Sequence, residues 1–114
     1  MLIDDGRVAI SYEDRGGTIR AIDHVPGDDH PDYVAVCEVT RLSADIVKLH
    51  AASGAMSRRH MRLVVRLLLE QGYRLAYIDR APGRVMPMAE RIRGGDWDGW
   101  WRLDLAAVRL APRG

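Results

Sequence analysis

Apolar and polar residues alternate near the start of the chain in the manner of β-strands. Residues 8–14 carry apolar side chains at every second position, and residues 18–25 continue the apolar pattern. A period of two places these side chains on one face of a strand. Arg15-Gly16-Gly17 separates the segments, and glycine reaches the positive φ of a tight turn at little cost. The pattern predicts a hairpin.

The next segments predict a loop, a strand and an element of uncertain type. Residues 26–32 are rich in Pro, Gly and Asp, a loop composition. Residues 33–42 predict a strand, with two expected faces: Val34, Val36 and Glu38 on one, Ala35, Cys37 and Val39 on the other. Residues 44–52 fit a strand or a helix capped by Ser43, and periodicity alone leaves both open.

The clearest element is an amphipathic helix over residues 57–71. Its apolar residues recur at the spacing of one helical face, which three further leucines widen: Met61, Val64, Val65 and Leu68, with Leu63, Leu67 and Leu69. Ser57 is a candidate N-cap, and Gly72 stands where a left-handed residue often ends a helix. The buried strand predicted at Arg74–Asp79 follows at once, which favours parallel strand pairing.

The last part of the chain predicts one more helix and one more strand. Ala81-Pro82-Gly83 is a turn, and Pro87 fits the first turn of a short helix that runs to about Ile92. Residues 100–105 (WWRLDL) alternate as a strand. The expected order is β-β-β-β-α-β-α-β, a mixed α+β or α/β sheet packed by a long central helix.

The composition predicts one soluble domain over residues 1–114. Apolar residues make up 47% and charged residues 29%, as in ordinary folded domains. No apolar run approaches the ~20 residues of a membrane span. The N-terminus shows no basic region followed by a long apolar stretch, so no signal peptide is predicted. The single cysteine, Cys37, fits a reducing cytoplasm and is expected to be a small core residue.

Positive charge gathers at the start of the predicted helix, although the net charge is only +1. Arginine accounts for all basic residues except Lys48. Arg58, Arg59 and Arg62 lie where the helix dipole disfavours cations by about 0.3–1 kcal/mol each. One interpretation is a bound anion that accepts backbone N–H groups and pairs with the arginines. The other is a solvated stripe on an amphipathic helix.

Residues 44–79 (ADIVKLHAASGAMSRRHMRLVVRLLLEQGYRLAYID) resemble the core of the GNAT superfamily of N-acyltransferases. The shared pattern is a strand, a loop of small residues, a long helix that ends in Gly-Tyr, and a following strand. The later segments MPMAERI and WWRLDL are similar to the family's next helix and strand. The resemblance covers about two thirds of the chain.

The resemblance implies that the strand before the helix splays from its parallel neighbour and that an acyl-CoA, acetyl-CoA or another, lies in the opening. It implies a strand over Asp45 to His50 and a pyrophosphate at the helix N-terminus. The family loop carries Arg/Gln-x-x-Gly-x-Gly/Ala, whereas Ala52 replaces the first residue and Gly54 stands one position early. The implied cofactor-binding residues are Ala51, Ala52, Ser53, Gly54, Ala55, Met56, Ser57, Arg58, Arg59 and Arg62.

The resemblance also implies a shortened member. Family members usually carry two helices after the first strand, which form much of the acceptor site, and here only Arg-Gly-Gly joins the first two predicted strands. Three possibilities follow: a minimal N-acetyltransferase, a degenerate relative that binds acyl-CoA without reacting, or an unrelated α+β domain.

Acyl transfer to an amine needs a base for the amine and an acid for the leaving thiolate. The candidate catalytic residues are Glu38, Asp45 and His50, with Tyr77 as a candidate acid. His50 and Tyr77 also fit ordinary structural roles. His60, in the arginine-rich helix, is a candidate contact for an anion. The His and Asp residues between positions 23 and 32 match no known metal-ligand spacing, so no metal is predicted.

Two other functions are consistent with the sequence. Trp97, Trp100 and Trp101 cluster near the C-terminus, and tryptophan is enriched at interfaces, so a homodimer through this region is a hypothesis. A non-enzymatic phage or mobile-element accessory factor would fit such a dimer. Nucleic-acid binding is the weakest hypothesis, because the net charge is near neutral. It would use Arg58, Arg62, Arg66, Arg109 and Arg113.

Overall fold

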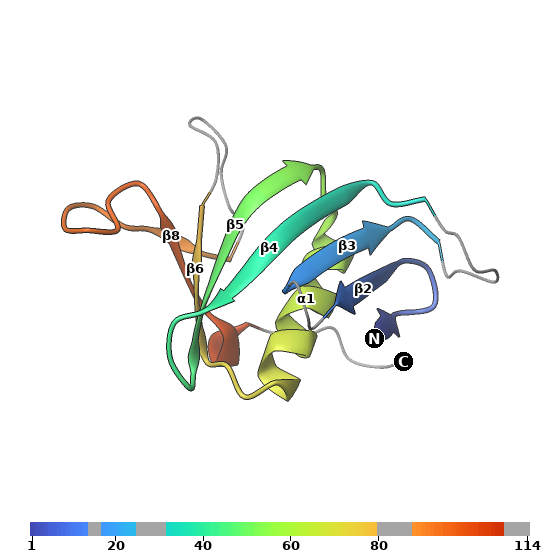
Figure 1. Cartoon of the computed structure of the whole chain (residues 1–114), viewed down its shortest axis with the longest axis horizontal. Helices are drawn as coiled ribbons and strands as arrows, with labels where there is room; N and C mark the ends of the chain where they lie inside the picture. The colour runs from blue at the N-terminus through green and yellow to red at the C-terminus, as the bar shows by residue number, and fades with distance from the viewer. Residues whose placement is uncertain (14–16, 25–31, 80–87, 109–114) are drawn as a thin grey trace.

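The protein is a small α+β fold built on one mixed sheet (Figure 1). The computed structural model describes residues 1–13, 17–24, 32–79 and 88–108. In these residues the sheet has eight strands, and one α-helix and one 3-10 helix accompany it. The elements are β1 (Leu2–Asp4), β2 (Ala9–Glu13), β3 (Thr18–Ile22), β4 (Ala35–Arg41), β5 (Ile46–Gly54), α1 (Arg58–Glu70), β6 (Leu75–Ile78), β7 (Glu90–Arg91), β8 (Trp101–Asp104) and η1 (Leu105–Ala107).

The strands lie in the order β1-β2-β3-β4-β5-β6-β8-β7. All neighbouring pairs are antiparallel except β5 and β6, which are parallel and joined through α1. The parallel pair is the arrangement predicted from a helix followed at once by a strand. It also decides between the two interpretations of residues 44–52. Residues 46–52 form a strand because β5 pairs with β4 on one side and with β6 on the other.

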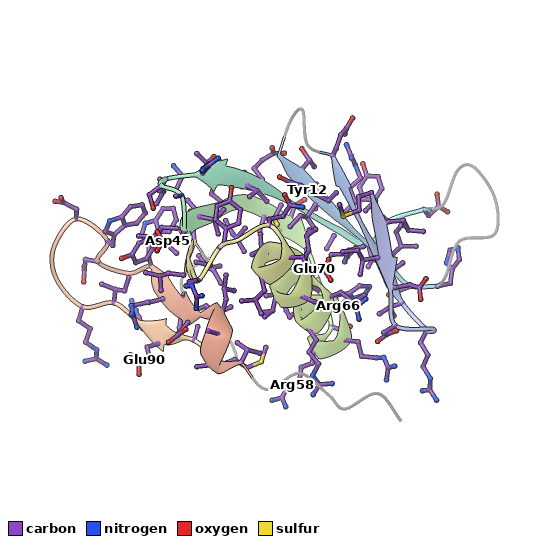
Figure 2. The ribbon with its side chains drawn as sticks, turned by 90° about the horizontal axis from the view of Figure 1, so that it is seen from below. Tyr12, Asp45, Arg58, Arg66, Glu70 and Glu90 are labelled. Atoms are coloured by element: carbon purple, nitrogen blue, oxygen red, sulfur yellow. The ribbon has the colours of Figure 1, made fainter. Side chains whose placement is uncertain are left out.

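Helix α1 packs its apolar stripe against one face of the sheet, as Figure 2 shows from below. The predicted helix is confirmed, with Ser57 as N-cap and Gly72 at φ +94° just after the C-cap. Its leucines and valines join the buried side chains of the strands in one core, which includes Ile10, Ile19, Val47, Ala76 and Leu103. No described helix is long and apolar enough to cross a membrane.

Most of the predicted strands are confirmed. The predicted hairpin corresponds to β2 and β3, which pair from Ala9–Ile22 to Glu13–Thr18. The strands predicted at 33–42, 74–79 and 100–105 correspond to β4, β6 and β8. The loop predicted at 26–32 and the turn at 81–83 fall almost wholly outside the described residues. The sequence pattern missed β1, an edge strand of three residues.

The short helix predicted from Pro87 to about Ile92 is wrong where the structure describes it. Glu90 and Arg91 form β7, which pairs with Arg102 and Trp101 of β8. Met88 has φ +71°, which no right-handed helix accommodates. The helix-forming residues of this segment gain more from hydrogen bonds to the exposed edge of β8 than from a single turn of helix. Pro87 lies outside the described residues.

Candidate functional site

The parallel strands β5 and β6 stay together for four residue pairs and then part. Their register runs from Ile46–Leu75 to Leu49–Ile78. The last bond between them joins the Asp79 N–H to the Leu49 carbonyl oxygen at 3.0 Å. Beyond this point β5 continues to Gly54, and among the described residues this part pairs only with β4. Figure 1 shows the two strands diverging toward the end of β5.

A β-bulge in β5 accounts for the point at which the strands part. His50 pairs with Glu38, but Ser53 pairs with Val36, so β5 has one more residue than β4 across this step. Ala51, in the extra step, has φ +51°, an uncommon value for a residue other than glycine. A bulge bends its strand and increases its local twist. The direction of β5 therefore changes just after its last contact with β6.

A pocket of about 80 Å³ lies beside this opening and the start of α1. Its floor is apolar and almost inaccessible to solvent, and consists of Cys37, Leu49, Val64 and Ile78. Its exposed rim is polar, with Ser53, Ser57, Arg58 and Asp79. Met56, Met61 and Met88 contribute to its walls. The pocket thus combines an apolar interior with polar and charged groups at its mouth.

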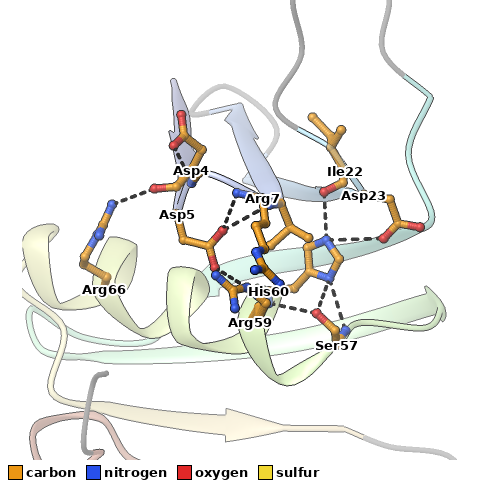
Figure 3. A network of polar contacts seen from close by, with 11 residues as sticks. Asp4, Asp5, Arg7, Ile22, Asp23, Ser57, Arg59, His60 and Arg66 are labelled. Carbon is orange, nitrogen blue, oxygen red and sulfur yellow. Dashed lines mark hydrogen bonds and ion pairs between the residues drawn. The ribbon is translucent and has the colours of Figure 1, made fainter. Parts of the chain in front are cut away.

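The arginines of α1 divide into paired and unpaired ones. The Arg59 Nε donates to the Asp5 carboxylate at 2.7 Å, and an Arg66 guanidinium N–H donates to the Asp4 carbonyl oxygen at 3.3 Å (Figure 3). Both acidic residues lie where β1 ends and its turn begins. Arg58 lines the pocket and has no hydrogen-bond or ion-pair partner among the described residues. Its side chain extends away from the core (Figure 2).

A buried hydrogen bond from His60 connects the start of α1 to β3. The imidazole is 1% exposed. Its Nδ1 accepts the Ser57 backbone N–H at 3.1 Å, and the Ser57 hydroxyl accepts the His60 N–H, which completes a capping box. This assigns the ring proton to Nε2, which donates to the Ile22 carbonyl oxygen at 2.9 Å (Figure 3). Both ring nitrogens are therefore hydrogen-bonded within the protein, and the Asp23 carboxylate lies 3.8 Å from Nε2, so neither nitrogen is free for a bound anion.

The four candidate catalytic residues do not line the pocket. Val47, Leu49, Ala76 and Ile78 are buried on the α1 side, so the alternate positions His50 and Tyr77 belong to the opposite face of the sheet.

Each of the four candidates has a contact elsewhere. Glu38 accepts from the Thr18 hydroxyl at 3.2 Å, and His50 Nε2 lies 2.7 Å from the Thr40 hydroxyl oxygen. Tyr77 stacks on Trp97, with ring centroids 4.6 Å apart. Asp45, just before β5, accepts from the Ser43 hydroxyl at 3.0 Å.

The residues expected to bind a cofactor divide between the pocket and its surroundings. Those that line the pocket are Ala52, Ser53, Gly54, Met56, Ser57 and Arg58. Those that do not are Ala51, Ala55, Arg59 and Arg62. Sequence reasoning missed the floor and Asp79. The sequence held no signal for the floor, because the pairing of Leu49 with Ile78 depends on the register of β5 against β6.

Burial raises the pKa of the Cys37 thiol to about 12, and the neighbouring Glu38 carboxylate adds to this effect. The side chain is therefore a neutral thiol near pH 7, as expected of a small core residue. Among the described residues, no group of three or more His, Cys, Asp and Glu side chains is arranged to hold a metal ion. Since the other floor residues are aliphatic, the floor of the pocket carries no charge.

No protein-family model matches this chain, and neither a curated protein nor a solved structure proves similar to it. The pocket is therefore the main basis for assigning a function.

Proposed function

We propose that this chain is a short, GNAT-like domain that binds an acyl-CoA in the opening between β5 and β6. The observation that carries the proposal is the end of strand pairing at Leu49, with a pocket in the resulting gap beside the start of α1. A strand that parts from its parallel neighbour next to a helix N-terminus is also what the resemblance of residues 44–79 implies.

The chemistry of the opening suits a slender ligand with amides and an anionic end. Among the residues that the structure describes, the backbone of β5 beyond Leu49 pairs only with β4, so we expect its polar groups on the β6 side to bind ligand amides. The N–H groups of Ser57 and His60 are used in the capping box, which leaves those of Arg58 and Arg59 in the first turn of α1. These groups and the Arg58 guanidinium favour an anion at the rim.

We assign binding rather than acyl transfer to the domain. Glu38, His50 and Tyr77 lie on β4, β5 and β6, but none of them lines the pocket, and neither does Asp45. A general base must come within hydrogen-bond reach of the proton it removes. Asp79 is the one carboxylate of the described lining, and it stands on the rim. We therefore expect bound acyl-CoA to remain unreacted when amines are added.

The two alternative functions have less support from contacts. Trp97 stacks on Tyr77 and meets Trp100 edge-on at 4.9 Å between ring centroids, so these rings already pack within one chain. Arg59 and Arg66 are engaged with Asp5 and Asp4, which weakens the continuous basic stripe that nucleic-acid binding would need.

The test is calorimetric titration and thermal unfolding with CoA and acetyl-CoA. A ligand that binds only the folded state raises the unfolding temperature. Arg58→Glu should weaken binding about tenfold, because it reverses a charge at the mouth of the pocket. Arg62→Glu is the matched control: it lies one turn further along α1, outside the pocket lining, and should leave affinity unchanged.

Absence of any stabilisation by CoA or acetyl-CoA at millimolar concentration would overturn the proposal. Equal weakening by the two substitutions would also count against it, because a general loss of positive charge would then explain the effect. Release of CoA thiol from acetyl-CoA in the presence of amines separates binding from catalysis. We expect release at the uncatalysed rate in samples where calorimetry shows a saturated complex.

A further inference from the structure

The interior of the pocket is more apolar than a two-carbon acetyl group requires. Leu49 and Ile78 are 4% exposed and Val64 is 1% exposed, and the three form the floor together with the neutral thiol of Cys37. No charged side chain lies among these floor residues. Such a surface offers nothing for a thioester carbonyl to pair with, but it gains free energy by covering methylene groups.

Methionines form a large part of the walls. Met56 and Met61 are partly buried and pack against the core, and Met88 is 46% exposed at the mouth. Together they are three of the five methionines in the chain. Methionine is unbranched and has three rotatable bonds, so it adapts to flexible apolar groups and is common at adaptable binding surfaces. A flexible chain suits these walls better than a rigid ring system.

The volume limits the length of such a chain. A water-sized group needs about 10–15 Å³ of this kind of space, so 80 Å³ holds about five to eight groups of that size. A methylene is close to a water molecule in size. Drug-sized ligands occupy pockets of about 300–1,000 Å³, which excludes a bulky ligand from the interior.

We infer that the acyl group carried by the ligand is a flexible chain of medium length, about six to eight carbons, whose apolar part occupies the floor between Leu49, Val64 and Ile78. This inference rests on the proposed binding of acyl-CoA and names the class of acyl group. The polar rim then lies beside the amides and phosphates of CoA. The residues that set chain length are those of the floor and the methionine walls, and Met61 contributes to these walls from α1.

The experiment is calorimetry with CoA and a series of its saturated thioesters: acetyl, butanoyl, hexanoyl, octanoyl and dodecanoyl. Burying one methylene contributes about 0.8 kcal/mol, or about fourfold in Kd, when burial is complete. We expect the Kd to fall by about two- to fourfold per methylene up to hexanoyl- or octanoyl-CoA and then to level off. A Kd for acetyl-CoA equal to that for octanoyl-CoA would overturn the inference while the proposed function stands.

The outcomes separate the two proposals. If no CoA compound of any length binds, both fall. A fall in Kd that continues unchanged to dodecanoyl-CoA would overturn the limit on length, since the chain would then bind outside the pocket.

A pair of variants tests whether the acyl chain binds in the pocket. Met61→Trp reduces the space and should move the best chain length toward butanoyl while the Kd for CoA itself stays constant. Leu69→Trp, on the same helix but outside the pocket lining, is the control and should leave the chain-length profile in place. If Met61→Trp does not fold, Met61→Ala enlarges the pocket and should move the best length upward. An unchanged profile in a folded Met61 variant would overturn the inference.

Discussion

At the scale of single residues, Gly54 shows how a small residue can serve packing rather than a ligand. The small residues before α1 predict a surface on which a phosphate can approach the backbone. In the structure Gly54 has φ +80°, and a Cβ atom there would collide with the Val34 carbonyl oxygen. The close approach of the chain at Val34, just before β4, therefore excludes a side chain at this position, whether or not a ligand binds.

Replacing Gly54 by alanine should cost far more stability than the same change at Gly72. Gly72 has φ +94°, but a Cβ atom there would have nothing within 4 Å, so Gly72→Ala carries only the backbone cost of about 1–2 kcal/mol. Gly54→Ala adds a contact with backbone that cannot move without breaking β4–β5 pairing, so its loss should exceed that value by about 1 kcal/mol or more. Urea unfolding of both variants measures the difference. Equal losses in the free energy of unfolding would show that the chain at β4 can shift to make room for the alanine side chain without loss of stability.

At the scale of elements, polar contacts of different kinds join α1 to the first strands of the sheet. His60 bonds to Ile22 of β3 in a buried site, and Arg59 pairs with Asp5 after β1 at a more exposed one. Burial alone would raise the pKa of Asp5. The N–H groups of Val8 and Arg7 and the Arg59 guanidinium outweigh this effect, so its pKa is lowered. The charged carboxylate is thus preferred in the folded state.

A lowered pKa makes the contribution of Asp5 depend on pH. The stabilisation is complete above the unfolded pKa of about 3.9 and is lost as pH falls through the lower folded value. The site is partly exposed and therefore screened, so we expect a loss of at most about 1 kcal/mol between pH 5 and pH 2. Asp5→Asn should flatten this part of the stability profile in urea unfolding, and Glu70→Gln, an exposed control on α1, should not. Parallel profiles for wild type and Asp5→Asn would contradict the assignment.

The sequence predicts an element correctly when the residues that determine its conformation lie within the element itself. The helix at 57–71 has its cap, its apolar stripe and its terminal Gly72 within one segment, and all three occur in the structure. Residues 46–54 become a strand because β4 and β6 lie on either side, and that information is outside the segment. The same reason explains the error at Glu90 and Arg91, where pairing with β8 decides the conformation.

At the scale of the whole molecule, the sheet brings together residues that are distant in sequence. Cys37 of β4, Leu49 of β5, Val64 of α1 and Ile78 of β6 meet on one pocket floor. Sequence reasoning found Ser53, Ser57 and Arg58 of the rim, because these residues lie within one short segment. It could not find the floor, because which apolar residues face one another depends on strand register and on the bulge at Ala51. Strand register also decides that His50 and Tyr77 belong to the other face.

Because Cys37 lies in the common core under α1, its ionisation should report on unfolding of the whole molecule. Its folded pKa of about 12 lies above the ordinary value of 9.0. A raised folded pKa means that the contribution to stability is complete below pH 9 and is lost as pH rises toward 12, since the unfolded chain ionises first. Between pH 8 and pH 10 the wild type should lose about 1 kcal/mol more than Cys37→Ala. Urea unfolding of both proteins at the two pH values measures this difference, and the comparison cancels every contribution that the two proteins share. Identical losses would mean that the thiol ionises equally readily in the folded and unfolded chains, and therefore that the pocket floor is open to water.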